Sequence, residues 1–410
     1  MSGHDETPAR DGLDVLLVNH TSTVSGAEVS LLDLVEGLVA EHRVTIAAPD
    51  GPLARSARAR GARVELIPAM EGSLRLHPRH TPRTLGGIAG SARAIREIAR
   101  RTRSDVVHAN SFRAGLAASL AACVGAPRPL VHLHDCLPDT ASARATEQVL
   151  SCGAATILAN SAYTAACFNG GRSRAPVKVV HNPIDLERFD PARVDRAEAR
   201  RDLGLDPDQF VLAVLAQITP WKGQDTAVEA VRLLRDRGLG VRLLVAGEVK
   251  FRRPLTRYDN DTYLRELHAS VGSLGLEDAV SFTGDCTDPP GLLRAIDCLL
   301  VPSWAEPWGR VVVEAMAMGT PVVATSAGGT AELVADGRNG LLAAPRDPVA
   351  WADATEALAR DPGLGRRMVA AGRETARCFS RDAYVQHVLE IYREAVGPPR
   401  RSSSRQTVGV

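Results

Sequence analysis

The feature that most constrains the fold of this chain is an alternation of short aliphatic runs with longer helical patterns, which occurs twice along the sequence. A strand of a parallel sheet is buried on both faces, so it reads as a short, unbroken run of Val, Leu and Ile. The connection to the next parallel strand is usually a helix, and it is right-handed. We therefore predict an α/β fold of two Rossmann-like domains, whose doubly wound parallel sheets face each other across a cleft.

The candidate strands form two series. Six runs in the first half are expected to be strands buried on both faces, at residues 15–18, 44–48, 64–67, 106–108, 130–133 and 156–159. Five more follow at residues 210–216, 241–246, 280–283, 298–301 and 321–325. Segments 27–39 and 84–101 have helical spacing, and the apolar stretch 114–126 is too short for a membrane span, which predicts a buried helix.

Changes in composition divide the chain into parts. A segment with two prolines and alternating charge, HNPIDLERFDPAR, separates the two series and reads as a linker. Polar ends with few large apolar residues are expected to be disordered. The predicted parts are a disordered segment 1–11, an N-terminal domain 12–182, a hinge 183–193, a C-terminal domain 194–378, a helix 379–397 that returns toward the N-terminal domain, and a disordered tail 398–410.

Charge and cysteine content exclude several classes of protein. Lys and Arg number 49 and Asp and Glu 48, a net charge of +1 that argues against nucleic acid as the main partner. Seven scattered cysteines without a C-x-x-C pair favour neither a disulfide framework nor a zinc site. The N-terminus lacks the apolar core of a secretory signal. We expect a reduced, cytoplasmic protein.

Two loops that follow predicted strands could bind a ligand. In the first, Ser25 and Glu28 have capping-box spacing, which is sufficient as a structural explanation. The small residues Gly26 and Ala27 would also let a ligand approach the helix N–H groups. In the second, AQITPWKGQD, Lys222 is either a solvated lysine or an ammonium placed beside a phosphate.

The strongest signal is the segment PSWAEPWGRVVVEAMAMGTPVVAT at residues 302–325. Glu306 precedes a Pro-Trp-Gly turn, and Glu314 follows after seven intervening residues in an otherwise apolar helical stretch. A carboxylate in such a place needs a partner. The partner is either a hydroxyl-bearing ligand or an internal salt bridge.

These motifs together resemble the retaining family 4 glycosyltransferases of the GT-B fold. The resemblance rests on W-K-G, on the LGL…VSFTG stretch at 274–284, on the two glutamates and on the SAGGTAE run at 326–332. It implies a nucleotide-sugar donor held mainly by the C-terminal domain and an acceptor bound mainly by the N-terminal one.

The resemblance also implies roles for single residues. Catalytic roles fall to His134, Lys222 and Glu306. Asn110, His134 and Asp135 are expected at the acceptor. On the donor side, Glu314 is expected to bind the ribose, Glu306 the transferred sugar and the backbone near Cys286 the base. The diphosphate is expected to meet Lys222 and the N–H groups of Gly309, Arg310 and Val311, with Gly26 and Ala27 facing the phosphates or the sugar.

The chain departs from the family pattern at three positions. Gln217 stands where an Arg usually precedes the W-K-G lysine, Asn110 stands where a second His is frequent, and Arg310 replaces an aliphatic residue. We hypothesise that the Arg310 guanidinium supplies the charge that is missing at Gln217, beside the diphosphate.

The predicted function is retaining transfer of a hexose-type sugar to a hydroxyl of a small-molecule or glycan acceptor, without a metal ion or cofactor. A UDP-sugar is favoured over a GDP-sugar. The triplets 206–208 and 259–261, both D-x-D, are expected to be turn or cap residues. The basic run 93–103 is either a solvated face or a weak contact with anionic membrane. Two alternatives stay open, a nucleotide-sugar epimerase on the same fold and a non-catalytic nucleotide-sugar-binding protein.

Overall fold

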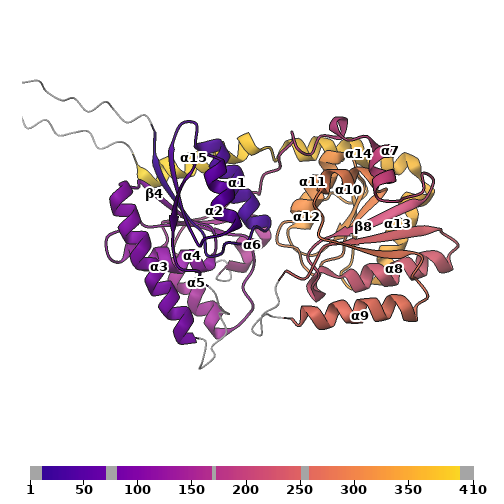
Figure 1. Cartoon of the computed structure of the whole chain (residues 1–410), viewed down its shortest axis with the longest axis horizontal. Coiled ribbons are helices and arrows are strands. Elements are labelled where there is room, and N and C mark those ends of the chain that lie inside the picture. Colours follow the sequence, from indigo (N-terminus) through magenta and orange to yellow (C-terminus); the bar gives the residue numbers. More distant parts are fainter. Residues whose placement is uncertain (1–11, 71–80, 169–171, 251–257, 398–410) are drawn as a thin grey trace, which may run out of the picture.

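The computed structural model of the protein describes residues 12–70, 81–168, 172–250 and 258–397. The described residues form two lobes that lie side by side, each built on a parallel sheet with helices on both faces (Figure 1). The first sheet has seven strands in the order β3-β2-β1-β4-β5-β6-β7, and the second has six in the order β10-β9-β8-β11-β12-β13. The predicted fold class is confirmed. The predicted disordered ends, 1–11 and 398–410, lie outside the described residues.

The elements of the first lobe alternate as predicted. Its strands are β1 (Asp14–Val18), β2 (Arg43–Ala48), β3 (Arg63–Leu66), β4 (Val106–Ala109), β5 (Leu130–Leu133), β6 (Thr156–Ala159) and β7 (Val177–Val179). Its helices are α1 (Gly26–Leu38), α2 (Pro52–Ala59), α3 (Thr81–Thr102), α4 (Phe112–Ala122), α5 (Ala141–Gly153) and α6 (Ala162–Cys167).

The second lobe repeats the alternation. Its strands are β8 (Phe210–Leu215), β9 (Val241–Ala246), β10 (Val280–Gly284), β11 (Cys298–Val301), β12 (Val322–Thr325) and β13 (Leu341–Ala343). Its helices are α7 (Arg196–Asp202), α8 (Gln224–Asp236), α9 (Asn260–Ser273), α10 (Pro289–Ala295), α11 (Arg310–Met318), α12 (Thr330–Leu333), α13 (Pro348–Arg360) and α14 (Pro362–Arg377). Among the described helices, none is both long and apolar enough to cross a bilayer.

One prediction about burial is wrong. The run 64–67 was expected to be buried on both faces, but β3 is partly open to solvent and its Leu66 side chain is 58% exposed. The reason is position, because β3 is the edge strand of the first sheet and has a neighbour on one side only. The interior strands β1, β4, β5 and β6 are buried along their whole length.

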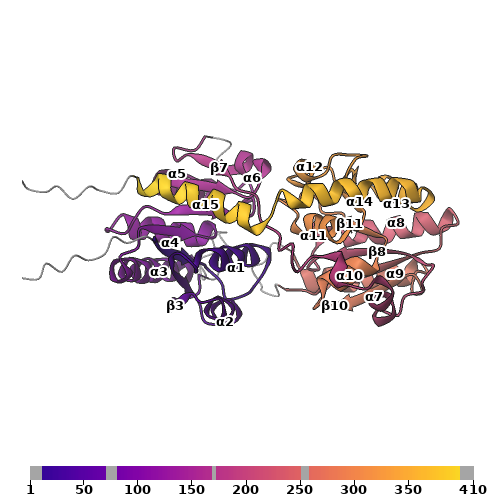
Figure 2. The ribbon, with the colours of Figure 1, turned by 90° about the horizontal axis from the view of Figure 1, so that it is seen from above.

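The last helix, α15 (Arg381–Val396), follows the second lobe in sequence but packs on the first. It leaves α14 and runs across the sheet of the first lobe (Figure 2). Its buried residues Tyr384, Val388 and Tyr392 join the core cluster that also contains residues of α1 and β4. At its start, Arg381 donates to Glu36 of α1 and to Asp185 of the linker, each at 2.6 Å. The helix therefore ties the two lobes together.

Candidate active site

Lys222 and Glu306 meet at the carboxyl ends of β8 and β11, which are neighbours in the second sheet. The Lys222 Nζ lies 2.6 Å from Oε2 of Glu306, and the Ser303 hydroxyl donates to the same oxygen at 2.8 Å. Only 15% and 10% of the two side chains are exposed. Carboxyl ends of parallel strands are where such sheets bind ligands. The structure therefore places a shielded ion pair at the edge where a ligand is expected.

Glycines allow the loops around this pair to approach closely. Gly223 of W-K-G has φ +70°, and a Cβ on it would lie 2.0 Å from the carbonyl oxygen of Pro302. Gly328 has φ +88°, and a Cβ there would lie 2.3 Å from the carbonyl oxygen of Glu306. No other residue fits such a backbone contact. Both glycine-containing motifs thus hold the Glu306 loop in place.

Glu314 forms the internal salt bridge that the sequence left open as one alternative. Its Oε1 lies 3.5 Å from Nη2 of Arg310, one turn earlier in α11. The Arg310 guanidinium also donates to the Ser30 hydroxyl and to the Pro183 carbonyl, each at 3.0 Å, and lies 3.6 Å from Asp33. Arg310 is therefore held between α1, the linker and Glu314. Its hypothesised contact with a diphosphate stays a prediction, as does the contact of Glu314 with a ribose.

The first lobe contributes a polar pocket of about 230 Å³. It collects residues from the loop before α1, from the start of α4 and from the loop after β5. The lining is polar apart from Ala27 and Phe112, and consists of His20, Thr21, Thr23, Ser25, Ala27, Glu28, Asn110, Ser111, Phe112, Arg113, His134 and Asp135.

His134 is a neutral imidazole in this pocket. Its Nε2 lies 2.9 Å from Oδ1 of Asn110, whose amide nitrogen donates to the Ala27 carbonyl at 3.3 Å and to Oδ1 of Asn19 at 3.3 Å. The amide is thereby oriented so that its oxygen accepts the Nε2 proton. Burial lowers the pKa of His134 to about 4, a hydrogen bond with the Asn182 side chain opposes this shift, and the positive charge of Arg310 adds to it. Asn110 is thus committed to protein partners, and its predicted contact with an acceptor remains a prediction.

Asp135 is an exposed residue in the wall of the polar pocket, close enough to the Lys222–Glu306 pair for the charges of that pair to act on it. The protein around its carboxyl raises the pKa of Asp135 to about 6, the negative charge of Glu306 raises it further, and the Lys222 ammonium opposes both. Asp135 of the first lobe and the ion pair of the second therefore lie near one another.

The remaining predicted site residues lie around these groups. A Cβ on Gly26 would lie 3.5 Å from Cδ of Arg310, so the starts of α1 and α11 face each other. Gly309, with φ +88°, precedes α11, and Val311 is in its first turn. The Gln217 carbonyl accepts from Nε2 of Gln224 at 3.0 Å.

Cys286 lies apart from this group. It follows β10 and packs against the core of the second lobe, where burial raises the pKa of its thiol to about 11. In the residues described, no contact joins it to the Lys222–Glu306 pair. Its predicted place at the base stays untested.

Sequence reasoning gave no role to Glu332, which links the lobes. Its carboxylate accepts the N–H groups of Ala162 at 2.9 Å and Tyr163 at 2.7 Å, at the start of α6. Beside it the His181 ring stacks on Trp308 with centroids 4.3 Å apart. Glu332 is the last residue of the SAGGTAE motif, so the sequence did mark this segment. Its contacts could not be predicted, because its partners are on the other lobe. Arg113 and His20, which line the polar pocket, had no recognisable sequence signal.

The two D-x-D triplets are turn and cap residues, as expected. Asp206 accepts the Asp208 N–H at 2.9 Å, and Asp259 caps α9 by accepting the Thr262 N–H at 3.0 Å. Within the described residues no group of three or more His, Cys, Asp or Glu could hold a metal ion. The metal independence of the reaction remains a prediction.

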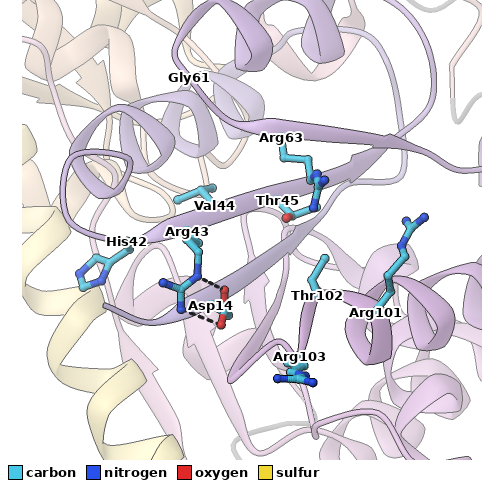
Figure 3. Close-up of a pocket in the computed structure, with 10 residues that line it drawn as sticks. All are labelled: Asp14, His42, Arg43, Val44, Thr45, Gly61, Arg63, Arg101, Thr102 and Arg103. Atoms are coloured by element: carbon cyan, nitrogen blue, oxygen red, sulfur yellow. Dashed lines mark hydrogen bonds and ion pairs between the residues drawn. The ribbon is translucent and has the colours of Figure 1, made fainter. Parts of the chain in front are cut away.

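A larger hollow of about 640 Å³ lies elsewhere, at the amino ends of β1, β2 and β3 (Figure 3). Four guanidinium groups line it, from Arg43, Arg63, Arg101 and Arg103. Two of them are paired with carboxylates, since Arg43 binds Asp14 at 2.5 Å and Arg101 lies 2.8 Å from Glu65. Because ligands of such sheets bind at the opposite, carboxyl edge, this hollow is separate from the candidate site. The hollow does not test the membrane contact that the sequence left open for residues 93–103.

Comparisons with known proteins agree with this geometry. The family described as Glycosyl transferases group 1 matches residues 195–375, and Glycosyltransferase Family 4 matches residues 24–188. The D-inositol 3-phosphate glycosyltransferase of Pseudarthrobacter chlorophenolicus is 33% identical over 329 residues, 74% of either chain. The protein of that name from Salinispora arenicola is 39% identical over 228 residues, 54% of this chain and 50% of its own. The chain thus spans about half the length of the first curated relatives that it matches.

A solved structure extends the comparison over nearly the whole chain. Anabaena Alr3699/HepE in complex with UDP-glucose is 25% identical and superimposes with a TM-score of 0.80. The superposition covers 93% of this chain and 100% of that one.

Proposed function

The chain belongs to the family 4 glycosyltransferases of the GT-B fold, and from this premise we propose that it transfers a hexose-type sugar from a UDP-sugar to a hydroxyl of a small polyhydroxylated acceptor. The transfer is proposed to retain the anomeric configuration and to need no metal ion. The neighbour solved with UDP-glucose supports the choice of donor, and the names of the curated relatives support a cyclitol-like acceptor.

One arrangement of charged and polar groups supports the proposal best. Lys222 and Glu306 lie on the second lobe, and His134 and Asp135 lie near them on the first. Breaking a bond between a sugar and a diphosphate builds negative charge on the leaving group. A preorganised cation stabilises that charge most effectively where water is scarce. Lys222 is such a cation, since it is 15% exposed and held at a fixed place by Glu306.

Each group has a proposed task. Lys222 turns from Glu306 toward the diphosphate, and the N–H groups at the start of α11 bind the same group through the positive end of the helix dipole. Glu306, released from Lys222, accepts hydroxyl hydrogen bonds from the transferred sugar. The neutral His134 binds a sugar hydroxyl, while Asp135 orients the acceptor.

The stereochemical course follows from what the cleft offers. Retention by double displacement would need a carboxylate nucleophile beside the anomeric carbon, about 5–5.5 Å from an acid/base partner. Glu306 is proposed to accept hydrogen bonds from sugar hydroxyls and keeps its contact with Ser303, while Glu28 is held by Asn19 and Ser25. We therefore favour attack on the same face, in which the leaving diphosphate takes the proton of the acceptor hydroxyl.

The volume and lining of the polar pocket support the proposed class of acceptor. A volume of about 230 Å³ suits a single ring, and walls rich in hydroxyl, amide and charged groups suit a molecule with many hydroxyls. A lipid or an apolar aglycone would shield this polar wall from water without offering it hydrogen bonds, and each polar group left unsatisfied costs about 1–3 kcal/mol. Arg113 in the pocket wall would favour a ring that bears one anionic group, such as a cyclitol phosphate.

The test combines a donor screen with product analysis. UDP- and GDP-sugars are first ranked by the thermal shift that they produce, and the best donor is then incubated with cyclitols, cyclitol phosphates and apolar alcohols. The proposal predicts release of UDP and a new α- or β-glycoside of the same anomeric configuration as the donor, seen by NMR. Interconversion of sugars with no UDP released would indicate an epimerase. Saturable donor binding without product from any acceptor would indicate a binding protein.

A further inference from the structure

A row of three imidazoles crosses the first lobe beneath α15 and ends at the candidate site. His108 lies on β4, His132 on β5, and His134 directly after β5. The ring centroids are 5.4 Å apart between His108 and His132, and 4.2 Å apart between His132 and His134. Because His108 pairs with Leu130 in the parallel register, and residues two apart share a face, all three rings project from the same face of the sheet.

The far end of the row is anchored by the C-terminal helix. The Tyr392 hydroxyl of α15 lies 2.7 Å from Nδ1 of His108, and the two rings meet edge to face with centroids 5.8 Å apart. Tyr392 and the first two imidazoles of the row are fully buried. A contact between residues 284 positions apart therefore defines where the row begins.

The row is uncharged. Burial lowers the pKa of His108 to about 3 and depresses that of His132 strongly, and each imidazolium would also repel its neighbours. The other charge that acts on the row is the Arg310 guanidinium, which disfavours protonation of His134. The buried imidazoles therefore stay neutral at neutral pH, and their role is to hold one another's rings, which are tilted by 52° and 31°, in place.

The row matters most for the orientation of His134. The ring is bound to Asn110 through Nε2, and the torsion about its Cβ–Cγ bond sets the plane of the ring in the pocket. The His132 ring lies against it with an interplanar angle of 31°, which restricts this torsion. His132 is in turn flanked by His108 and by the Tyr384 ring at 6.4 Å.

We propose that Tyr392, His108 and His132 are positioning residues that fix the plane of the His134 imidazole in the acceptor pocket. Through them the C-terminal helix, which begins at the second lobe, sets the geometry of a group on the first. The consequence for turnover rests on the proposed function, whereas the orientation of the His134 ring is a property of the chain itself.

The test compares two tyrosines of the same helix in the full-length protein. Tyr392→Phe removes the hydrogen bond to His108, while the matched control Tyr384→Phe leaves that bond intact. The first readout is the position of the His134 ring signals in ¹⁵N–¹H spectra, which requires no activity. The proposal predicts that these signals move in Tyr392→Phe and stay in place in Tyr384→Phe. Unmoved His134 signals in Tyr392→Phe would overturn it.

Kinetics supply the second readout. Small displacements of a catalytic group reduce turnover by up to about a hundredfold, so we expect Tyr392→Phe to lower kcat roughly tenfold with an unchanged Kd for UDP. His132→Leu, which removes the stacking ring, is expected to lower kcat as well, and His132→Phe to restore most of it. Equal kcat losses in both tyrosine variants, or equal losses for Leu and Phe at position 132, would contradict positioning. If no substrate is turned over by the parent protein, the proposed function fails while the spectra still decide this inference.

Discussion

At the scale of single residues, the Lys222–Glu306 pair is the arrangement from which most of the proposed chemistry follows. A lysine held beside a carboxylate in a shielded place is either a structural ion pair or a charge kept ready for an anionic ligand. The two possibilities differ in what happens when a diphosphate is added. In a structural pair, Lys222 stays bound to Glu306 when the diphosphate is added. In a binding pair, the Lys222 ammonium leaves Glu306 and binds the diphosphate.

Lys222→Ala is therefore expected to weaken binding of UDP. Loss of a charge-assisted hydrogen bond of about 1.5–3 kcal/mol corresponds to a roughly tenfold to hundredfold rise in Kd, which calorimetry can measure. Lys178 offers a matched control, since it is paired with Glu394 on the surface of the first lobe. Lys178→Ala should leave the Kd for UDP unchanged, and an equal weakening in both variants would refute the assignment.

Arg310 allows two roles to be separated. The structure holds its guanidinium among Ser30, Asp33, Pro183 and Glu314. Arg310→Leu would leave Glu314 without its cation and Asp33 with Arg381 alone, 3.8 Å away, and we expect the free energy of unfolding to fall by about 2 kcal/mol in chemical denaturation. If Arg310 also meets the diphosphate, the Kd for UDP rises in the same variant. A variant that keeps its stability would show that these contacts are unimportant.

Asp135 gives a prediction for the dependence of stability on pH. Its pKa of about 6 in the folded protein exceeds the value of about 3.9 in an unfolded chain, so folding favours the protonated form. The Asp135 carboxyl stabilises the fold fully below about pH 4, where it is protonated in both states. This stabilisation is lost as the pH rises through about 6, and at higher pH the free energy of unfolding no longer changes through this group. Asp135→Asn removes this dependence.

The measurement is thermal unfolding between pH 4 and pH 7.5. Asp135→Asn is expected to unfold at a higher temperature than the parent protein at pH 7, with the difference shrinking toward pH 4. Because the side chain touches solvent, screening keeps the difference small. The neighbouring Asp139, whose side chain is 87% exposed, supplies the control Asp139→Asn, which should show no such trend. If the unfolding temperatures of Asp135→Asn and of the parent protein depended on pH in the same way, the pKa of Asp135 would not be raised.

Predictability from the sequence also differs among these residues. Lys222 and Glu306 each follow a run that reads as a buried strand, and neighbouring strands bring their carboxyl ends together, so their meeting could be expected. The partners of Arg310 could not, because Ser30 and Pro183 belong to another lobe and to the linker. Nothing in a single sequence reports which surfaces of two lobes touch.

At the scale of elements, the interior strands of both described sheets were predicted, whereas of the edge strands only β3 and β10 were. A strand between two neighbours is covered on both faces, so selection for burial leaves an unbroken aliphatic run. The edge strands β7 and β13 have three residues each, are partly exposed, and escaped prediction. The same reasoning accounts for the error at β3, whose run looked like that of an interior strand.

The W-K-G turn shows how a short motif positions an element. Gly223 has a left-handed backbone conformation and lies against the Pro302 carbonyl, which places Lys222 opposite Glu306. Gly238 has a similar φ of +82° with no atom near its Cβ position. Gly223→Ala combines backbone strain with a collision, whereas Gly238→Ala has the strain alone, about 1–2 kcal/mol.

We therefore expect Gly223→Ala to lower the free energy of unfolding by more than Gly238→Ala does, and to abolish most of the affinity for UDP. Chemical denaturation and calorimetry on both variants measure the two effects. Similar stability and affinity in the two variants would mean that the contact with Pro302 does not shape the loop.

At the scale of the whole molecule, three side chains of the described residues make polar contacts that join the lobes. Arg310 reaches α1 and the linker, Arg381 at the start of α15 reaches Glu36 and Asp185, and Glu332 caps α6. Arg310 and Arg381 also contact the linker, through Pro183 and Asp185. Glu332 differs because it joins the SAGGTAE loop to a helix start on the opposite wall. This contact must break if the cleft opens to admit a donor.

Glu332→Ala is accordingly expected to open the cleft without unfolding either lobe. Each lobe keeps its own core, so the thermal unfolding temperature should change little, while the radius of gyration in small-angle scattering increases. Glu374→Ala, at an exposed position of α14, is the control and should leave scattering unchanged. A ligand that touches both walls of the cleft favours closure, as the lost contact did. Addition of UDP should therefore reduce the difference in radius of gyration between the variant and the parent. Identical scattering by the variant and the parent without ligand would show that Glu332 does not hold the lobes together.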